Sequence, residues 1–480
     1  MRKIKLEYIL LGLILIFALF LRLYSLSHSP LWIDESTSSM ASKMILEKGI
    51  PVFDSGTVYS RAYVFHYTEA FFLLFGINDF NARLASVLFG MLTIVLVYFI
   101  GKEYSRSGGI ISALFFSVFY LEVFFSRQAR FYQLFQLMFF LCLYLLYKSG
   151  ETKNKKHHTI YLILSLVAFF IALDTQLAAL VLAPFIILHI ILYNKHKYLA
   201  ILPAVPLVMK FLPATKLSSG SAQSAVNYTD SYYSFTVNMQ YLLILFIPGV
   251  IWSFIQKKKL TLMLVIPSLV LLIGIFSLQV FALRYAYFFV FILVLYSSLL
   301  LAFLYEKYGN IMLITIICVL IIPSNFVFPF TYVNVIKPIN YNHGYSDFST
   351  PETNYLVVPS DLVTKLENKN NILVSFFSSD VEWYIRKPDY VIPFSMDGRG
   401  TDQISYNKTL NGVLTSEQVD TYSGAKILTP ETPLKKPYYV NADSFSTSKL
   451  KPAQRESFDK LILGCGTAYS AVDLKIYSCA

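Results

Sequence analysis

The sequence predicts a polytopic α-helical membrane protein that ends in a small soluble α/β domain. Hydrophobic residues make up 56% of the 480 residues and charged residues only 14%. Apolar runs of about 16 to 22 residues, each suited to cross a bilayer as a helix, recur along residues 1–330 between short polar breaks. After residue 330 the apolar stretches shorten, and Asn, Ser, Asp and Pro become frequent. We therefore expect a transmembrane domain over residues 1–330, including a loop over 25–80, and a soluble domain over 331–480.

The distribution of charge orients the predicted spans. Residues 1–330 carry 25 Lys and Arg against 13 Asp and Glu, whereas residues 331–480 carry 15 against 16. The basic excess lies in the short breaks between spans, as at residues 257–259, which is typical of cytoplasmic loops. The net charge of +11 is therefore a topology signal, and we expect no nucleic-acid partner.

We expect about eleven spans, with the N-terminus in the cytoplasm and the C-terminal domain outside the plasma membrane. The first apolar stretch follows Arg2, Lys3 and Lys5 and lacks a small-residue cleavage site, so we interpret it as an uncleaved helix. The spans are expected near residues 8–24, 80–100, 109–126, 131–147, 159–174, 177–193, 198–213, 241–256, 260–280, 285–305 and 311–330.

The segment between the first two spans is long enough to have structure of its own. Residues 36–48 place Met40, Met44 and Ile45 on one helical side and end at Gly49. We expect a short amphipathic helix that lies on the membrane and ends in a glycine cap. Residues 63–75 are apolar but short for a span, which predicts a re-entrant or interfacial helix.

The C-terminal segment mixes short strand-like and helical patterns. Its two cysteines, Cys465 and Cys479, would be free to form a disulfide in an oxidising compartment. Cys142 and Cys318 fall in apolar spans and are expected to be packing residues. Strands are predicted at 355–358, 372–377, 390–394, 462–463 and 474–477, and helices at 361–368 and 380–386. This pattern favours a small α/β domain.

Two adjacent carboxylates, Asp34 and Glu35, follow the first span directly. Acids at the edge of a bilayer are costly to desolvate, so their presence indicates a functional site. The alternative is that Asp34 or Ser36 caps the following helix. Since Ser36 alone would provide the cap acceptor, capping leaves the acid pair unexplained.

Arginines recur where the predicted spans meet the outer face. Arg127 and Arg130 are three residues apart, on one side of a helix. They either reach toward the interface, with Glu122 as a partner, or bind phosphate, because guanidinium donates paired hydrogen bonds to phosphoryl oxygens. Arg83 and Arg284 begin two other spans. Four such arginines beside exposed acids describe a site for an anionic headgroup next to a general base.

These motifs resemble those of GT-C glycosyltransferases. The matching residues are Trp32-Ile33-Asp34-Glu35, Asn81-Ala82-Arg83-Leu84, Ser126-Arg127-Gln128-Ala129-Arg130-Phe131-Tyr132 and Arg284-Tyr285. The resemblance covers roughly residues 8–305, and it is nearest to protein O-mannosyltransferases and lipid A aminoarabinose transferases. The C-terminal domain resembles no family that we can name.

The resemblance implies transfer of a sugar from a polyprenyl-phosphate or dolichyl-phosphate donor to a protein, lipid or glycan acceptor on the outer face. Asp34 would be the base that deprotonates the acceptor, and Glu35 would support it or contact the acceptor. A single base predicts inversion at the anomeric carbon. The residues expected to hold the donor phosphate are Arg83, Arg127, Arg130, Tyr132, Arg284 and Tyr285.

Several further residues are candidates with open alternatives. Arg61, His66, Glu69 and Asp174 could contact substrate, although a lone interfacial His is more often only hydrogen-bonded and Asp174 is equally a solvated loop acid. Mg²⁺ or Mn²⁺ on Asp34 and Glu35 is allowed but not demanded. The rival function is a transporter or flippase for a polyprenyl-linked or other anionic lipid, which would favour broken helices at the bilayer midplane. Sequons begin at Asn227 and Asn407, both on predicted outer segments.

Overall fold

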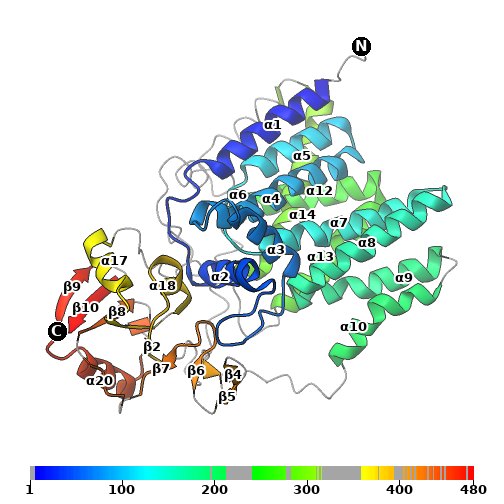
Figure 1. Ribbon diagram of the computed structural model, residues 1–480. Coiled ribbons are helices and arrows are strands. Elements are labelled where there is room, and N and C mark those ends of the chain that lie inside the picture. Colours follow the sequence, from blue (N-terminus) through cyan, green and yellow to red (C-terminus); the bar gives the residue numbers. More distant parts are fainter. Residues whose placement is uncertain are drawn as a thin grey trace.

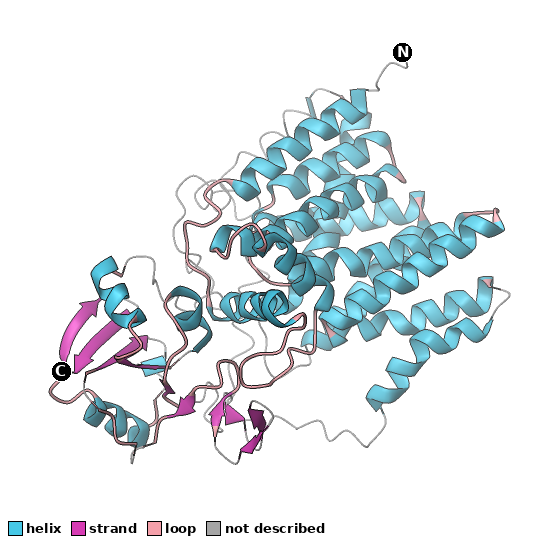
Figure 2. Cartoon of the chain, viewed as in Figure 1, coloured by secondary structure: helices cyan, strands magenta, loops and turns pink. Residues whose placement is uncertain are grey.

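The computed structural model contains a helical bundle and a smaller mixed α/β domain (Figure 1). It describes residues 6–194, 197–211, 240–276, 283–309, 311–312, 315 and, with short gaps, 358–479. Strands gather in the C-terminal domain, away from the long helices (Figure 2). Both sequons contain residues outside the described part of the chain. The predicted domain boundary at residue 330 also lies outside it.

The bundle is built from long apolar helices whose shared core is rich in Phe and Leu. Five of the described helices, α1, α4, α8, α13 and α14, are long and apolar enough to cross a membrane. The described helices of the bundle are α1 (Leu6–Leu23), α4 (Asp79–Lys102), α5 (Arg106–Val118), α6 (Tyr120–Phe125), α7 (Tyr132–Glu151), α8 (Lys155–Thr175), α9 (Ala183–Tyr193), α10 (Ile201–Phe211), α12 (Gln240–Gln256), α13 (Lys258–Phe276) and α14 (Leu283–Tyr308). Short 3-10 turns, η1 (Leu177–Leu182) and η2 (Lys197–Ala200), precede α9 and α10.

Each of the first ten predicted spans overlaps one or more of these helices, and five of the ten correspond to a described helix long and apolar enough to cross a membrane. The eleventh, at 311–330, lies almost wholly outside the described residues, so the number eleven remains a prediction. The span expected over 109–126 is divided, because Phe119 is extended between α5 and α6. Arg22 of α1 donates hydrogen bonds to the Ser117 and Phe116 carbonyls at 3.0 and 3.3 Å. These bonds satisfy carbonyls near the break, as an interrupted helix in a membrane requires.

Two short helices lie between the bundle and the C-terminal domain (Figure 1). Helix α2 (Ile33–Lys48) ends at Gly49, which has a φ of 76° and donates its N–H to the Ile45 carbonyl at 2.9 Å. The predicted helix and its glycine cap are thus confirmed, but its position is not. Met40 and Met44 are buried against other parts of the protein, including Phe53, so protein covers the apolar face of α2 that was expected to face lipid. Helix α3 (Tyr63–Leu73) also forms as expected.

The described residues of the C-terminal domain form a mixed sheet of eight strands with helices beside it. Its central strands β2, β1 and β8 run parallel, whereas β10 and β9 continue the sheet antiparallel. In the order β3-β6-β7-β2-β1-β8-β10-β9, the strands are Ile404–Ser405, Val419–Asp420, Lys426–Ile427, Tyr390–Val391, Ile372–Ser375, Tyr438–Asp443, Leu474–Cys479 and Gly466–Ser470. The hairpin β4 (Lys408–Leu410) and β5 (Val413–Thr415) is separate. The helices are α17 (Ser360–Glu367), α18 (Ser378–Tyr384) and α20 (Pro452–Leu461).

Of the elements predicted for this domain, strands β1, β2 and β10 and helices α17 and α18 occur, and several further short strands were not predicted. Residues 462–463 form no strand, because Ile462 ends α20. Helix α20 and the long strand β8 were not expected, since β8 contains Asn441 and Asp443 and lacks a continuous apolar run. The predicted strand at 355–358 lies mostly outside the described residues.

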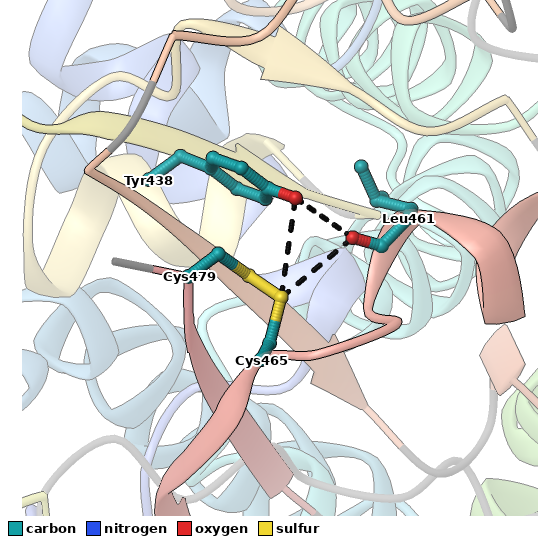
Figure 3. The surroundings of a disulfide bond; sticks show 4 residues. All are labelled: Tyr438, Leu461, Cys465 and Cys479. Atoms are coloured by element: carbon teal, nitrogen blue, oxygen red, sulfur yellow. Dashed lines mark hydrogen bonds between the residues drawn. A yellow bond between two sulfur atoms is a disulfide. The ribbon is translucent and has the colours of Figure 1, made fainter.

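A disulfide joins Cys465 and Cys479 at the edge of the C-terminal domain (Figure 3). It ties the start of β9 to the end of β10. The Tyr438 hydroxyl points toward this bridge and donates a hydrogen bond to the Leu461 carbonyl at 2.9 Å. The bridge therefore holds the last strand to the end of α20. Cys142 is buried in the core of the bundle, as expected for a packing residue.

Candidate active site

Asp34 lies in the first turn of α2 with its side chain 35% exposed. The backbone at Trp32 is extended, and α2 begins at the next residue. Asp34 is therefore the second residue of the helix. Its Oδ2 lies 3.7 Å from Nη2 of Arg130. The carboxylate is thus paired with a guanidinium at the N-terminus of α2, and its exposure makes it accessible to a ligand.

Arg130 is buried beneath Asp34 and retains an unused donor. Its Nη1 donates to the Asp34 carbonyl at 2.8 Å, to Ser38 Oγ at 2.6 Å and more weakly to the Tyr59 hydroxyl at 3.4 Å. Its guanidinium stacks on the ring of Phe131 at 4.6 Å. Nε is buried and has no hydrogen-bond acceptor among the described residues. A buried donor without an acceptor is costly, so this atom is suited to an anion.

Arg61 and Tyr59 extend the same site toward solvent. The exposed Arg61 guanidinium lies 5.4 Å from the Tyr59 ring and 5.2 Å from the Phe131 ring. Its Nη2 donates to the Tyr59 hydroxyl at 3.3 Å. Burial raises the pKa of Tyr59, but Arg130 and Arg61 outweigh it and hold that pKa below its ordinary value. We call Asp34, Tyr59, Arg61 and Arg130 the open cluster.

Glu35, next to Asp34, is buried and fully engaged. Its two carboxylate oxygens each accept a hydrogen bond from Arg83 at 3.0 Å, and Oε1 also accepts the Ala129 N–H at 2.6 Å. Oε2 accepts the Trp32 N–H at 3.3 Å. Glu35 therefore supplies the acceptor at the start of α2 that was expected from Ser36, whose hydroxyl instead contacts the Ile33 carbonyl and Asp380.

Arg83 has no donor left for a phosphate in this arrangement. Besides Glu35, it donates to the carbonyls of Leu26, Ser29 and Pro30 at 2.7 to 3.0 Å. These bonds use all five N–H groups of the guanidinium. We call the buried pair Glu35 and Arg83 the clamp, because it joins the loop after α1, the start of α2 and helix α4. This geometry favours a structural role over the donor-binding role expected for Arg83.

Arg127 is likewise directed into the protein. Its Nη1 donates to the Leu21 and Tyr24 carbonyls at 2.9 and 2.8 Å, and its Nη2 donates to Ser25 at 3.2 Å. It therefore satisfies carbonyls at the end of α1, which a helix leaves without partners. Arg127 and Arg130 were expected to act together, but Arg127 binds the end of α1 whereas Arg130 contacts Asp34. Tyr132 is buried, with Arg130 5.5 Å from its ring centre, so it supports the open cluster from behind.

His66 and Glu69 form a buried polar group with two serines of α2. Ser39 and Ser42 donate to the two Glu69 oxygens at 2.6 Å each, and Ser42 Oγ lies 3.1 Å from His66 Nδ1. Burial raises the pKa of Glu69 to about 8 and lowers that of His66 to about 3, with Arg130 and Arg61 adding to the His66 shift. Both side chains are thus mainly neutral at pH 7 despite their 3.6 Å separation. They join α2 to α3 and contact no open surface.

The remaining candidates lie outside the open cluster. Asp174, at the end of α8, accepts the Tyr63 N–H at 2.7 Å and so caps the N-terminus of α3. Arg284 and Tyr285 lie in the first turn of α14, and their side chains are outside what the structure describes. Within the described residues, no group of three or more His, Cys, Asp or Glu is placed to hold a metal ion. For Asp34 and Glu35 to share Mg²⁺ or Mn²⁺, Glu35 would have to leave Arg83.

Sequence reasoning missed the residues of the C-terminal domain that contact this region. Tyr384 and Trp383 both donate to Asp79 at 2.8 Å, and Asp380 contacts Ser36. An available signal was the Trp-Tyr pair at the end of a short helix that is otherwise polar. Tyr59 was also missed, because a single tyrosine in an aromatic-rich chain carries no signal.

Comparison with known proteins supports the resemblance predicted from the sequence. The sequence profile of the family dolichyl-phosphate-mannose-protein mannosyltransferase matches residues 62–213, which include Arg83, Arg127 and Arg130 but not Asp34. No curated protein matches the chain.

Solved structures extend the likeness to almost the whole chain. ArnT from Cupriavidus metallidurans in the apo state has 12% identity and a TM-score of 0.64, covering 98% of this chain and 97% of that one. ArnT bound to undecaprenyl phosphate has 13% identity, a TM-score of 0.59 and the same coverage. The Archaeoglobus fulgidus oligosaccharyltransferase in complex with Zn and sulfate has 11% identity and a TM-score of 0.54, covering 79% of this chain and 62% of that one. The chain therefore has the fold of GT-C membrane glycosyltransferases.

Proposed function

We propose that this protein is an inverting membrane glycosyltransferase that moves a sugar from a polyprenyl-phosphate donor to an acceptor, with Asp34 as the general base. The observation that carries the proposal is the contrast between the two adjacent acids. Asp34 is partly exposed beside Arg130, whereas every described contact of Glu35 is internal. A general base must reach the proton that it removes, so only Asp34 is suited to the role.

The reaction needs one base and one cationic site. The acceptor hydroxyl attacks the anomeric carbon and gives its proton to an oxygen of Asp34. The bond from the anomeric carbon to the phosphate oxygen breaks, and polyprenyl phosphate leaves with the electron pair. Attack opposite the leaving group inverts the anomeric carbon. Positive groups fixed near the phosphate stabilise the charge that develops on it.

Arg61 and Arg130 are the described arginines best suited to that phosphate. Arg61 is exposed, and Arg130 has a buried Nε without an acceptor in the described structure. Arg284 and Tyr285 remain candidates from their place at the start of α14. ArnT has been solved with undecaprenyl phosphate bound, which supports a carrier of this chemical class.

We further propose that the open cluster faces the outside of the plasma membrane. The basic breaks between spans support a cytoplasmic location for the opposite end of the bundle. The Cys465–Cys479 disulfide supports the same orientation, because disulfides persist in oxidising compartments.

The test is transfer by the purified protein from a panel of radiolabelled polyprenyl-phosphate sugars. The wild-type protein should transfer one of these sugars or release it to water. Asp34→Asn should lower kcat by about 10²- to 10⁴-fold, because it removes the base while keeping the size of the side chain. Binding of the donor to Asp34→Asn should persist. Asp459→Asn, which neutralises an exposed acid on α20, is the matched control and should behave as wild type.

Two outcomes would overturn the proposal. Full activity in Asp34→Asn would remove the mechanism. Movement of the labelled lipid from one leaflet of a proteoliposome to the other, without formation of a glycosidic bond, would favour the rival function, a transporter.

A further inference from the structure

Helix α18 of the C-terminal domain lies against α2, beside the segment that contains Asp34 (Figure 1). The contacts with the C-terminal domain include residues 31, 33, 36 and 37, on both sides of the acid. None of them is explained by the chemistry proposed above. They come from a part of the chain more than three hundred residues away in sequence.

The first contact holds the backbone before Asp34. The Leu31 N–H donates to the Tyr384 hydroxyl at 2.5 Å, and that hydroxyl donates onward to Asp79 Oδ2 at 2.8 Å. Trp383 Nε1 donates to the other oxygen, Asp79 Oδ1, at 2.8 Å. Burial and the charge of Asp79 hold the pKa of Tyr384 well above its ordinary value, so its hydroxyl keeps the proton that it donates. We call residues 31–36, which include Asp34, the catalytic segment. Tyr384 thus links the catalytic segment to the start of α4.

The second contact holds the residue beside Asp34. Ile33 packs against the apolar core of the C-terminal domain, which includes Val374, Phe376 and Val440. Its neighbour Asp34 therefore follows a side chain that is anchored in another domain. Trp383 adds packing on both faces, since it contacts one cluster around Leu31 and another around Met40.

The third contact holds the turn after Asp34. Ser36 Oγ is hydrogen-bonded to Asp380 and lies 3.0 Å from the Ile33 carbonyl. Thr37 Oγ1 lies 3.2 Å from Ser379 Oγ. The Ser36 hydroxyl donates to Asp380 Oδ1, so the buried Asp380 side chain is the acceptor that holds this turn.

We propose that the C-terminal domain positions the catalytic segment, with Tyr384 and Asp380 as its positioning residues. The inference rests on the proposed function of Asp34 and adds a task for the C-terminal domain. The clamp holds Glu35 from the bundle side, while Tyr384, the domain core and Asp380 hold residues 31, 33 and 36 from the other side. Asp34, between them, has its direction set by both domains. A base displaced by about 1 Å loses much of its effect, so this support governs kcat.

The test compares two Tyr→Phe variants in the full-length protein. Tyr384→Phe removes the hydroxyl that binds Leu31, whereas Tyr438→Phe removes a hydroxyl that is also hydrogen-bonded but lies in the interior of the C-terminal domain. Amide hydrogen exchange of a peptide covering residues 29–37 reports the support without requiring activity. We expect exchange there to be about tenfold faster in Tyr384→Phe and unchanged in Tyr438→Phe.

Kinetics provide the second readout. Tyr384→Phe should lower kcat about tenfold and leave the KM for the lipid-phosphate donor unchanged, because donor contacts are not altered. Asp380→Ala should do the same. Asp380→Asn should retain activity, because its amide oxygen can accept the hydrogen bond from Ser36 as the carboxyl oxygen does.

The outcomes separate this inference from the proposed function. Unchanged exchange at residues 29–37 in Tyr384→Phe would overturn the positioning role, even in an active enzyme. Equal loss of kcat in Tyr384→Phe and Tyr438→Phe would also overturn it, because it would indicate a general loss of domain stability. A wild-type protein without any transfer activity would instead refute the proposed function, and the exchange experiment would still decide whether the domain holds the segment.

Discussion

The open cluster and the clamp both combine an acid with arginine, and their acids Asp34 and Glu35 are neighbours in the sequence, but the two groups differ in how their hydrogen bonds are used. In the clamp, Arg83 directs all five donors to protein acceptors, and Glu35 is buried between Arg83 and Ala129. In the open cluster, Asp34 is one-third exposed, Arg61 is on the surface, and Arg130 keeps a buried donor without an acceptor among the described atoms.

This difference indicates which polar groups are available for chemistry. A polar group whose bonds are all made stabilises the fold, because removing either partner leaves the other one buried and unsatisfied. A polar group with capacity left can bind and transform a ligand. Residue type alone therefore does not identify a catalytic acid, and four experiments test whether the described contacts do.

The largest effect is expected from breaking the clamp. Arg83→Ala should lower the free energy of unfolding by about 3–5 kcal/mol, because it leaves Glu35 as a buried and unpaired charge. Thermal unfolding in detergent measures this loss. Arg106→Ala, at an exposed position on α5, is the control. The double variant Arg83→Met, Glu35→Leu should recover part of the loss, and a double variant as unstable as the sum of both single ones would contradict the assignment.

Asp380→Asn should change how stability depends on pH. Burial raises the pKa of Asp380 to about 7, with Asp443 and Asp34 adding to the shift and the Ser36 hydrogen bond opposing it. The folded state therefore binds the proton more tightly than the unfolded state, and stability falls as pH rises from about 4 to about 7.

The Asn side chain stays neutral, so the variant should gain on wild type across that range and keep a constant advantage above it, by up to about 4 kcal/mol. Unfolding midpoints between pH 4 and pH 8 measure the difference. Asp361→Asn, at an exposed position on α17, should show no such gain. A constant difference at all pH values would show that Asp380 does not titrate in this range.

Arg61 and Arg127 should separate binding from stability. Arg61→Ala should raise the KM for the donor about 10- to 100-fold, the loss of one charged hydrogen bond, with little change in thermal stability. Arg127→Ala should lower stability instead, because it leaves carbonyls at the end of α1 without donors. Parallel KM and melting measurements on both variants provide the test. A donor KM raised more by Arg127→Ala than by Arg61→Ala would reverse the comparison.

The smallest effect is expected at Asp174. Asp174→Ala should cost about 1 kcal/mol of stability, because α3 loses the acceptor at its N-terminus. Asp174→Asn keeps an acceptor oxygen and should cost less. Thermal unfolding of both variants resolves the order. A large loss of activity in Asp174→Asn, without a change in stability, would instead favour the substrate contact considered from the sequence.

Local patterns predicted the helices well and the packing between them poorly. The spans, the helix before Gly49 and the helix over 63–75 depend on composition and periodicity within one segment, so they could be identified one by one. The break at Phe119 could not, because it depends on Arg22 reaching over from α1. Met40 and Met44 predicted an apolar helix face correctly, but whether lipid or protein covers such a face depends on a distant domain.

The amino-acid sequence by itself determined a helical membrane protein with acids and arginines at one end of the bundle, because hydrophobicity and charge act through the nearby chain. Only the tertiary structure decided which of these charged groups are open. Asp34 and Glu35 are neighbours, and what separates them is a partner from α4 for Glu35 and the nearby Arg130 for Asp34. Whether a charged group is open depends on its hydrogen-bond partner, and in this protein the partners of both acids come from residues distant in the sequence.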